Sequence, residues 1–135
     1  MGAVIKNYME KIFVGKTCKA EYNPEKKWIV YTFDGYPEVE EHKVMYMKAM
    51  EYLKKNKTAA FIMDFRKMKG TFTMLNDWTI EFFRPAVEIG LKKSAMVLNN
   101  DIFTKFASND AIGKVKLIQI QTFKDPKEAE NWCEH

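Results

Sequence analysis

Polar side chains follow two of the most apolar runs of the chain. Of all the residues in the sequence, these are the best suited to bind a ligand or to take part in catalysis. Asp64 and Arg66 come directly after one run, and Asn99 and Asn100 follow another. Arg66 is one of two arginines, and its guanidinium could bind a carboxylate or a phosphate through two parallel hydrogen bonds. Asp64 could act as a general base. The plain alternative is that Arg66 pairs with Asp64 or caps a helix end, and that Asp64 orders the loop.

Other residue types offer less. Thr71 and Thr73 supply hydroxyl groups in the turn that follows Arg66. His42 lacks the second histidine four residues on that a helical zinc site requires, so we expect a surface histidine. Cys18 and Cys133 are too few and too far apart for a disulfide framework or a metal site. We therefore expect no catalytic residue, no metal and no cofactor.

The segment that must position these groups runs from Thr58 to Gly90. Residues 59–64 are typical of a strand buried on both faces of a sheet, and sites in open parallel sheets form where the carboxyl ends of such strands emerge. A helix from about 75 to 89 should follow, bent or broken at Pro85 and capped by Gly90. Its apolar residues form two stripes at helical spacing: Leu75, Trp78, Phe82, Ala86 and Ile89 in one, and Ile80, Phe83 and Val87 in the second. The second stripe could pack on a neighbouring helix or bind a partner.

Strands and helices alternate through the rest of the chain. A hairpin is expected over 19–33, a helix with Pro37 at its first position to about Lys55, strands at 94–98 and 117–123, a shorter helix after Asn99, and a last helix capped by Asp125. The order β-β-α-β-α-β-α-β-α predicts an α/β fold with a mixed, mostly parallel sheet of about five strands and about four helices. Residues 1–15 form an arm that suits either a helix or a strand, and residues 16–135 form a single domain.

Composition narrows the partners. The 135 residues carry a net charge of +4, which comes mainly from lysine. The lysines lie among acidic residues and form no stripe, so we expect a solvated surface and no nucleic-acid binding. No apolar run approaches the roughly 20 residues that span a bilayer, and Lys6, Glu10 and Lys11 interrupt the N-terminal apolar residues. The expected compartment is the cytoplasm.

The order of elements and its punctuating residues resemble the STAS superfamily of sulfate transporters and anti-sigma-factor antagonists, and in particular its small stand-alone bacterial members, many without an assigned function. The resemblance covers about Lys19 to Trp132 and rests on NPEKKWIVYTFDG, FIMDFRKM, W-x6-P-A-x3-G-L-K-K-S-A and DPKEAENW. It implies a STAS-like domain. The antagonist branch carries a phosphorylatable serine in a turn after the strand matched by 62–65. This chain has no serine in that turn, and Thr71 and Thr73 are its nearest hydroxyls, so a kinase-controlled switch is not expected.

Three functional hypotheses follow. The first is a non-catalytic interaction or regulatory module, whose partner is an unknown protein or a second copy bound through Ile80, Phe83 and Val87. The second is a binder of a small apolar or lipid-like molecule, because nine Met and ten Phe residues can line an adaptable pocket. The third, least favoured, is an enzyme with Asp64 as its base, which undiminished turnover in Asp64→Asn would exclude.

Overall fold

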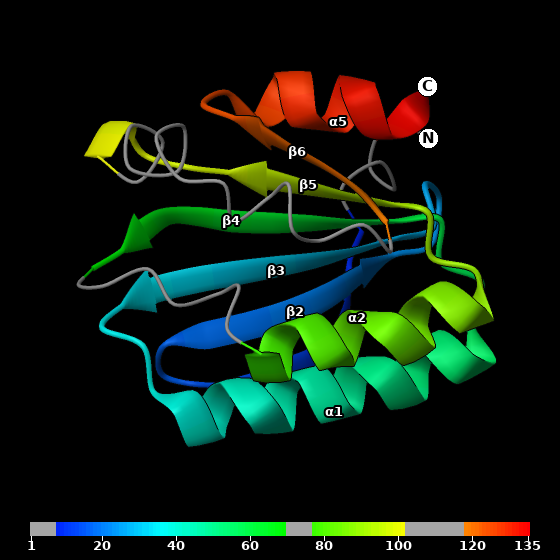
Figure 1. The fold of residues 1–135 in the computed structure, drawn as a ribbon, viewed down its shortest axis with the longest axis horizontal. Helices are drawn as coiled ribbons and strands as arrows, with labels where there is room; N and C mark the ends of the chain where they lie inside the picture. The colour runs from blue at the N-terminus through cyan, green and yellow to red at the C-terminus, as the bar shows by residue number, and fades with distance from the viewer. Residues whose placement is uncertain (1–7, 70–76, 102–117) are drawn as a thin grey trace.

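The protein is built on one mixed sheet, seen in a computed structural model that describes residues 8–69, 77–101 and 118–135 (Figure 1). The strands lie side by side in the order in which they occur in the chain. The first three are antiparallel, and the pairs β3–β4, β4–β5 and β5–β6 are parallel. The strands are β1 (Glu10–Val14), β2 (Cys18–Asn23), β3 (Trp28–Gly35), β4 (Ala60–Met68), β5 (Lys93–Val97) and β6 (Gln119–Phe123).

Helices cover both faces of this sheet. α1 (Val39–Lys55) and α2 (Asp77–Ile89) lie against one face, and α5 (Pro126–Glu134) lies against the other, over β4, β5 and β6 (Figure 1). The mixed, mostly parallel α/β class predicted from the sequence is confirmed. The sheet has a sixth strand, β1, which pairs with β2. β1 lies in the N-terminal arm, for which the sequence suited either a helix or a strand. The helix predicted after Asn99 falls mainly on residues outside those described.

Strict alternation in the central strands builds two cores. In β4, the Phe61, Met63 and Phe65 side chains join the core under α1 and α2, whereas Ala60 and Ile62 join the core under α5. All five are buried. A strand buried on both faces needs an unbroken apolar run, and the sequence supplies one here. This run fixes the position of the polar residues that follow it.

The hairpin predicted between β2 and β3 is confirmed. The Asn23 carboxamide accepts hydrogen bonds from Glu25 N at 3.1 Å and Lys26 N at 3.0 Å, and the Asn23 carbonyl accepts one from Lys27 N at 2.7 Å. Lys27 has a φ of 62°, in the left-handed region that glycine and asparagine favour. Side-chain bonding by the asparagine therefore fixes a turn whose last residue is a lysine in a costly conformation.

Two sequence predictions about α1 are wrong. The helix begins at Val39 with Glu38 as its N-cap, so Pro37 precedes it and is not its first residue. His42 is buried, with 7% of its surface exposed, and its ring centroid lies 5.1 Å from that of Phe33. The histidine faces inward because it lies one turn before Tyr46 on the stripe that packs against the sheet.

α2 departs from the prediction of a break at Pro85. The helix runs through Pro85 to Ile89 without a break. Pro85 is exposed, so water can reach the helical carbonyl that loses its partner there. Phe83, on the stripe that could pack within the fold or bind a partner, is fully buried, with its ring 6.1 Å from that of Phe61, so its burial favours packing. The predicted cap is confirmed: Gly90 has a φ of +128°, and its N–H donates to the Val87 carbonyl at 3.0 Å.

Candidate functional site

A bulge near the end of β4 presents the polar residues that the sequence singled out. Thr32 of β3 pairs with Asp64, but Asp34 pairs with Lys67. Two residues of β4, Phe65 and Arg66, therefore lie opposite a single residue of β3. The extra residue breaks the alternation. Phe65 stays in the core, and Arg66 continues the alternation of Ile62 and Asp64 and is exposed. The change of face comes after Arg66, because Lys67 is exposed and Met68 returns to the core.

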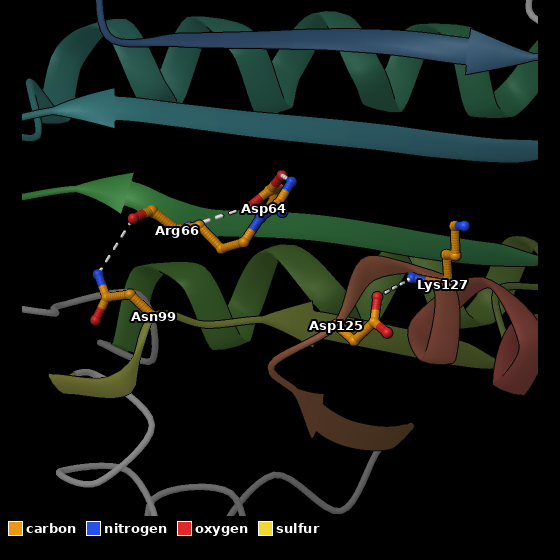
Figure 2. Close-up of polar contacts among 5 residues, drawn as sticks. All are labelled: Asp64, Arg66, Asn99, Asp125 and Lys127. Carbon is orange, nitrogen blue, oxygen red and sulfur yellow. Dashed lines mark hydrogen bonds and ion pairs between the residues drawn. The ribbon is translucent and has the colours of Figure 1, made fainter.

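Asp64 and Arg66 bind each other. Arg66 donates from Nε to Asp64 Oδ1 at 3.0 Å and from Nη2 to Oδ2 at 2.7 Å, and its backbone N–H also donates to Oδ1 at 3.0 Å (Figure 2). The Arg66 side chain is 45% exposed, and the Asp64 side chain is 21% exposed. These hydrogen bonds raise the pKa of the Arg66 guanidinium. The arrangement is the self-paired alternative recognised in the sequence, with both acceptor oxygens of the carboxylate engaged.

The end of β5 is tied to the same place. Asn99 Nδ2 donates to the backbone carbonyl of Arg66 at 3.3 Å (Figure 2). Asn100 is exposed at the start of the next helical turn. The structure therefore brings Asp64, Arg66 and Asn99 together, as their positions after parallel strands predicted, and leaves Asn100 beside them.

The end of β6 adds Asp125, which the sequence indicated as a helix cap alone. Its Oδ1 accepts from Lys127 N at 2.9 Å, which caps α5 as predicted, and Pro126 holds the first helical position (Figure 2). Its charge also helps to raise the pKa of Arg66, after the hydrogen bonds to Asp64. The signal for this proximity is topological, since the carboxyl ends of β4, β5 and β6 share one end of the sheet.

The remaining predicted site residues do not join this cluster. Thr71, Thr73 and the Ile80 side chain lie outside the part of the molecule that is described. Phe83 belongs to the core, and Val87 is half-buried. A continuous surface stripe through Phe83 is therefore excluded by its burial.

Neither cysteine is an activated nucleophile. Both thiols are free, and burial raises the pKa of Cys18 to about 12 and that of Cys133 to about 11. A nucleophilic cysteine has a pKa below the ordinary value, so these thiols behave as small apolar groups. In the described residues, no group of three or more His, Cys, Asp and Glu side chains is placed to hold a metal ion.

Comparison with known proteins supports the fold. No protein-family model matches the sequence, and no curated protein gives a significant match. Among solved structures, the chain is similar to an uncharacterised protein of the DUF3478 family from Shewanella loihica PV-4, which has a SpoIIAA-like fold. The TM-score is 0.61 at 15% identity, and the match covers 94% of this chain and 96% of that chain.

The chain thus has the SpoIIAA-like, STAS-like fold that its sequence predicted. At this level of identity the likeness concerns the fold alone. A separate observation bears on membranes: within residues 8–69, 77–101 and 118–135, no helix has the length and apolarity required to cross a bilayer.

Proposed function

We propose that this protein is a non-catalytic regulatory module that acts through protein–protein contacts, with the solvent face of α1 as its contact surface. The observation that carries the proposal is a concentration of exposed apolar side chains. Seven large apolar side chains are exposed among the described residues, and four of them lie in the twelve-residue segment that ends at Met47. They are Tyr36 (70% exposed), Val39 (54%), Val44 (42%) and Met47 (64%).

The arrangement on α1 suits a protein contact. Val44 and Met47 are three residues apart, so they lie one above the other on the side of the helix that faces away from the sheet. Glu40, Lys48 and Glu51 lie around them and are exposed. An apolar centre with a charged rim is the usual composition of a protein interface. Single exposed apolar residues need no explanation, whereas a group in one segment does.

The polar cluster at the strand ends supports the non-catalytic part of the proposal. A general base must have a free carboxylate oxygen within reach of a substrate proton. Both oxygens of Asp64 are instead engaged by Arg66. We assign this pair the structural role of ordering the end of β4 beside its bulge.

The free cysteines also fit our proposal for the compartment. Cys18 and Cys133 lie in different elements and form no disulfide. Cysteines that remain unpaired are typical of proteins in reducing compartments. We therefore propose that the module works in the cytoplasm, where its partner is another protein or a second copy of the chain.

A substitution of Met47 tests the proposal. Met47→Asp places a charge within the apolar group, on an exposed side chain outside the core, so folding should survive, whereas Phe83→Asp would disrupt the core. Val14→Asp is the matched control, since Val14 is 60% exposed and lies on β1. The tagged variants are used for affinity capture from cells and for native mass spectrometry.

The expected result is a protein complex, heteromeric or homomeric, that is formed by the wild type and Val14→Asp and lost with Met47→Asp. Identical complexes in all three proteins, or none in any, would contradict the proposal. The apolar-ligand alternative stays a prediction, and the same mass spectra test it. A small-molecule adduct at unit stoichiometry would favour that alternative.

A further inference from the structure

Lysines from three separate loops meet at the end of the sheet opposite the Asp64–Arg66 pair. The β2–β3 turn, the end of α1 and the end of α2 all reach this end, at the right of Figure 1. Backbone hydrogen bonds hold the loops in sequence across the sheet, from Ala59 N to Lys27 O at 2.9 Å and from Lys92 N to Ala59 O at 3.4 Å. We call the exposed lysines of these loops and of the last turn of α1 the lysine edge: Lys27, Lys54, Lys55, Lys57 and Lys92.

The charges of the lysine edge are not neutralised within the described part of the chain. None of the five ammonium groups takes part in an ion pair there. Two neighbouring lysines contrast with them. Lys26 forms an ion pair with Glu134, and Lys93 donates from Nζ to the Trp132 carbonyl at 2.9 Å. Those two side chains contact the end of α5, whereas the lysine edge makes no comparable side-chain contact among the residues that the structure describes.

Helix electrostatics account for part of the lysine edge. Lys54 and Lys55 lie in the last turn of α1, where the negative end of the helix dipole stabilises a positive charge. Lys57 lies beyond the helix, and Lys92 precedes a strand. Lys27 adopts a left-handed backbone conformation that a long side chain does not favour. Within the described residues, the ammonium groups of these three lysines have no ion-pair partner.

We infer that the lysine edge binds an acidic, Asp- or Glu-rich segment of a partner protein. The inference rests on the proposed function and names the chemistry of its partner. The lysine edge continues the α1 contact surface, because Glu51 and then Lys54 and Lys55 follow Met47 along the outward side of that helix. A partner seated on α1 can therefore reach the lysine edge.

The composition of the surroundings favours a protein segment over a nucleic acid or a membrane. The cations are all lysines, which act as point charges and lack the planar fork of arginine that reads phosphates and bases. Exposed Glu25, Glu51 and Glu88 border the cluster. A continuous line or plane of phosphates would meet these carboxylates, whereas a protein segment contacts the lysines locally and can avoid them.

Peptide binding by matched variants tests the inference. The edge variant carries Lys27→Asn, Lys57→Gln and Lys92→Gln. The control variant carries Lys16→Gln, Lys67→Gln and Lys69→Gln, which are exposed lysines at the opposite end of the strands, and it loses the same three charges. The probes are a fluorescein-labelled peptide of alternating Glu and Ser, a labelled oligothymidine of matched charge, and anionic phosphatidylserine vesicles, all at about 50 mM salt.

The expected result is saturable peptide binding by the full-length wild type that is weakened about tenfold or more in the edge variant, since each exposed charge contributes a factor of about two to five. The control variant should bind within about twofold of the wild type. Equal weakening of both variants, no saturable peptide binding, or preferred binding of the oligothymidine or the vesicles would overturn the inference. Loss of the Met47-dependent complex is read separately, so a failure here leaves the proposed function testable.

Discussion

Glu41 holds Thr17 through two hydrogen bonds to one carboxylate oxygen: Thr17 N and Thr17 Oγ1 each donate to Glu41 Oε1 at 2.7 Å. Lys16 N donates to the other oxygen at 3.0 Å. The loop between β1 and β2 is thereby clamped to the first turn of α1. Gly15 leaves room for this contact, because a Cβ there would lie 2.6 Å from the Glu41 carboxyl carbon and the Glu41 side chain would have to shift. This clamp sets the position of the helix whose outer face we propose as the contact surface.

Loss of the clamp should destabilise the protein. Glu41→Ala leaves the backbone donors of the loop without their acceptor, at a cost of about 1–3 kcal/mol in the free energy of unfolding. Urea unfolding followed by tryptophan fluorescence measures the change. Glu40→Ala is the control, because the Glu40 side chain is 90% exposed, and it should cost less than about 0.5 kcal/mol. Equal losses in the two variants would show that the clamp contributes nothing specific.

The same carboxylate predicts a pH dependence. Burial acts to raise the pKa of Glu41, but the hydrogen bonds from Thr17 and Lys16 outweigh it and lower the pKa to about 2. The unfolded chain then binds a proton near the ordinary value of 4.5 that the folded protein does not. The stabilisation is therefore complete above about pH 4.5 and is lost as the pH falls towards 2. Glu41→Gln should reduce the slope of the free energy of unfolding against pH in this window. An unchanged slope would refute the assignment to Glu41.

His42 predicts a second slope at higher pH. Burial lowers the pKa of His42 below 6.5, and its Nε2 has no hydrogen-bond partner among the described residues. The unfolded chain takes up a proton below pH 6.5 before the folded protein does, so stability falls on acidification from that pH, by at most about 1.4 kcal/mol per pH unit. His42→Phe should remove this loss, as measured by urea unfolding at several pH values between 5 and 7. A slope equal to that of the wild type would place the titration elsewhere.

The Asp64–Arg66 pair should contribute little to stability despite its favourable geometry. Both side chains are partly exposed, and ion pairs of this kind are screened by solvent. A double-mutant cycle with Asp64→Ala and Arg66→Ala should give a coupling energy below about 1 kcal/mol. A coupling of several kcal/mol would instead identify the pair as a main support of β4.

The central segment could be predicted because its local signals agree with the fold. The apolar run ending at Met63 predicted a doubly buried strand, and the parallel topology then placed Asp64 and Asn99 at one end of the sheet. The bulge that follows Asp64 in β4 could not be predicted, because an extra residue in a strand is fixed by the pairing of that strand with β3 and has no composition of its own. Asp125 lies near the cluster because the carboxyl end of β6 is at the same end of the sheet, whereas its sequence context predicts only a helix cap.

The sequence does not predict the burial of His42 and Phe83 for a shared physical reason: the pattern of a single helix does not show which neighbouring elements cover it. His42 lies at the edge of the apolar stripe of α1, and the ring of Phe33 on a neighbouring strand decides that it is buried. Phe83 lies on a second stripe that is covered by the rest of the fold. The lysine edge was missed because its residues are far apart in sequence. A usable signal was present, since KK precedes β3, KKNK lies shortly before β4, and KK lies at the start of β5.

Photocrosslinking from position 47 tests the central claim most directly. The full-length protein carries p-benzoylphenylalanine in place of Met47 or, as the matched control, in place of Val14, and it is irradiated in its native host. The account predicts a discrete crosslinked protein from position 47 and none of that mass from position 14, because the solvent face of α1 is the contact surface. Crosslinks of equal yield from both positions, or from neither, would contradict the account.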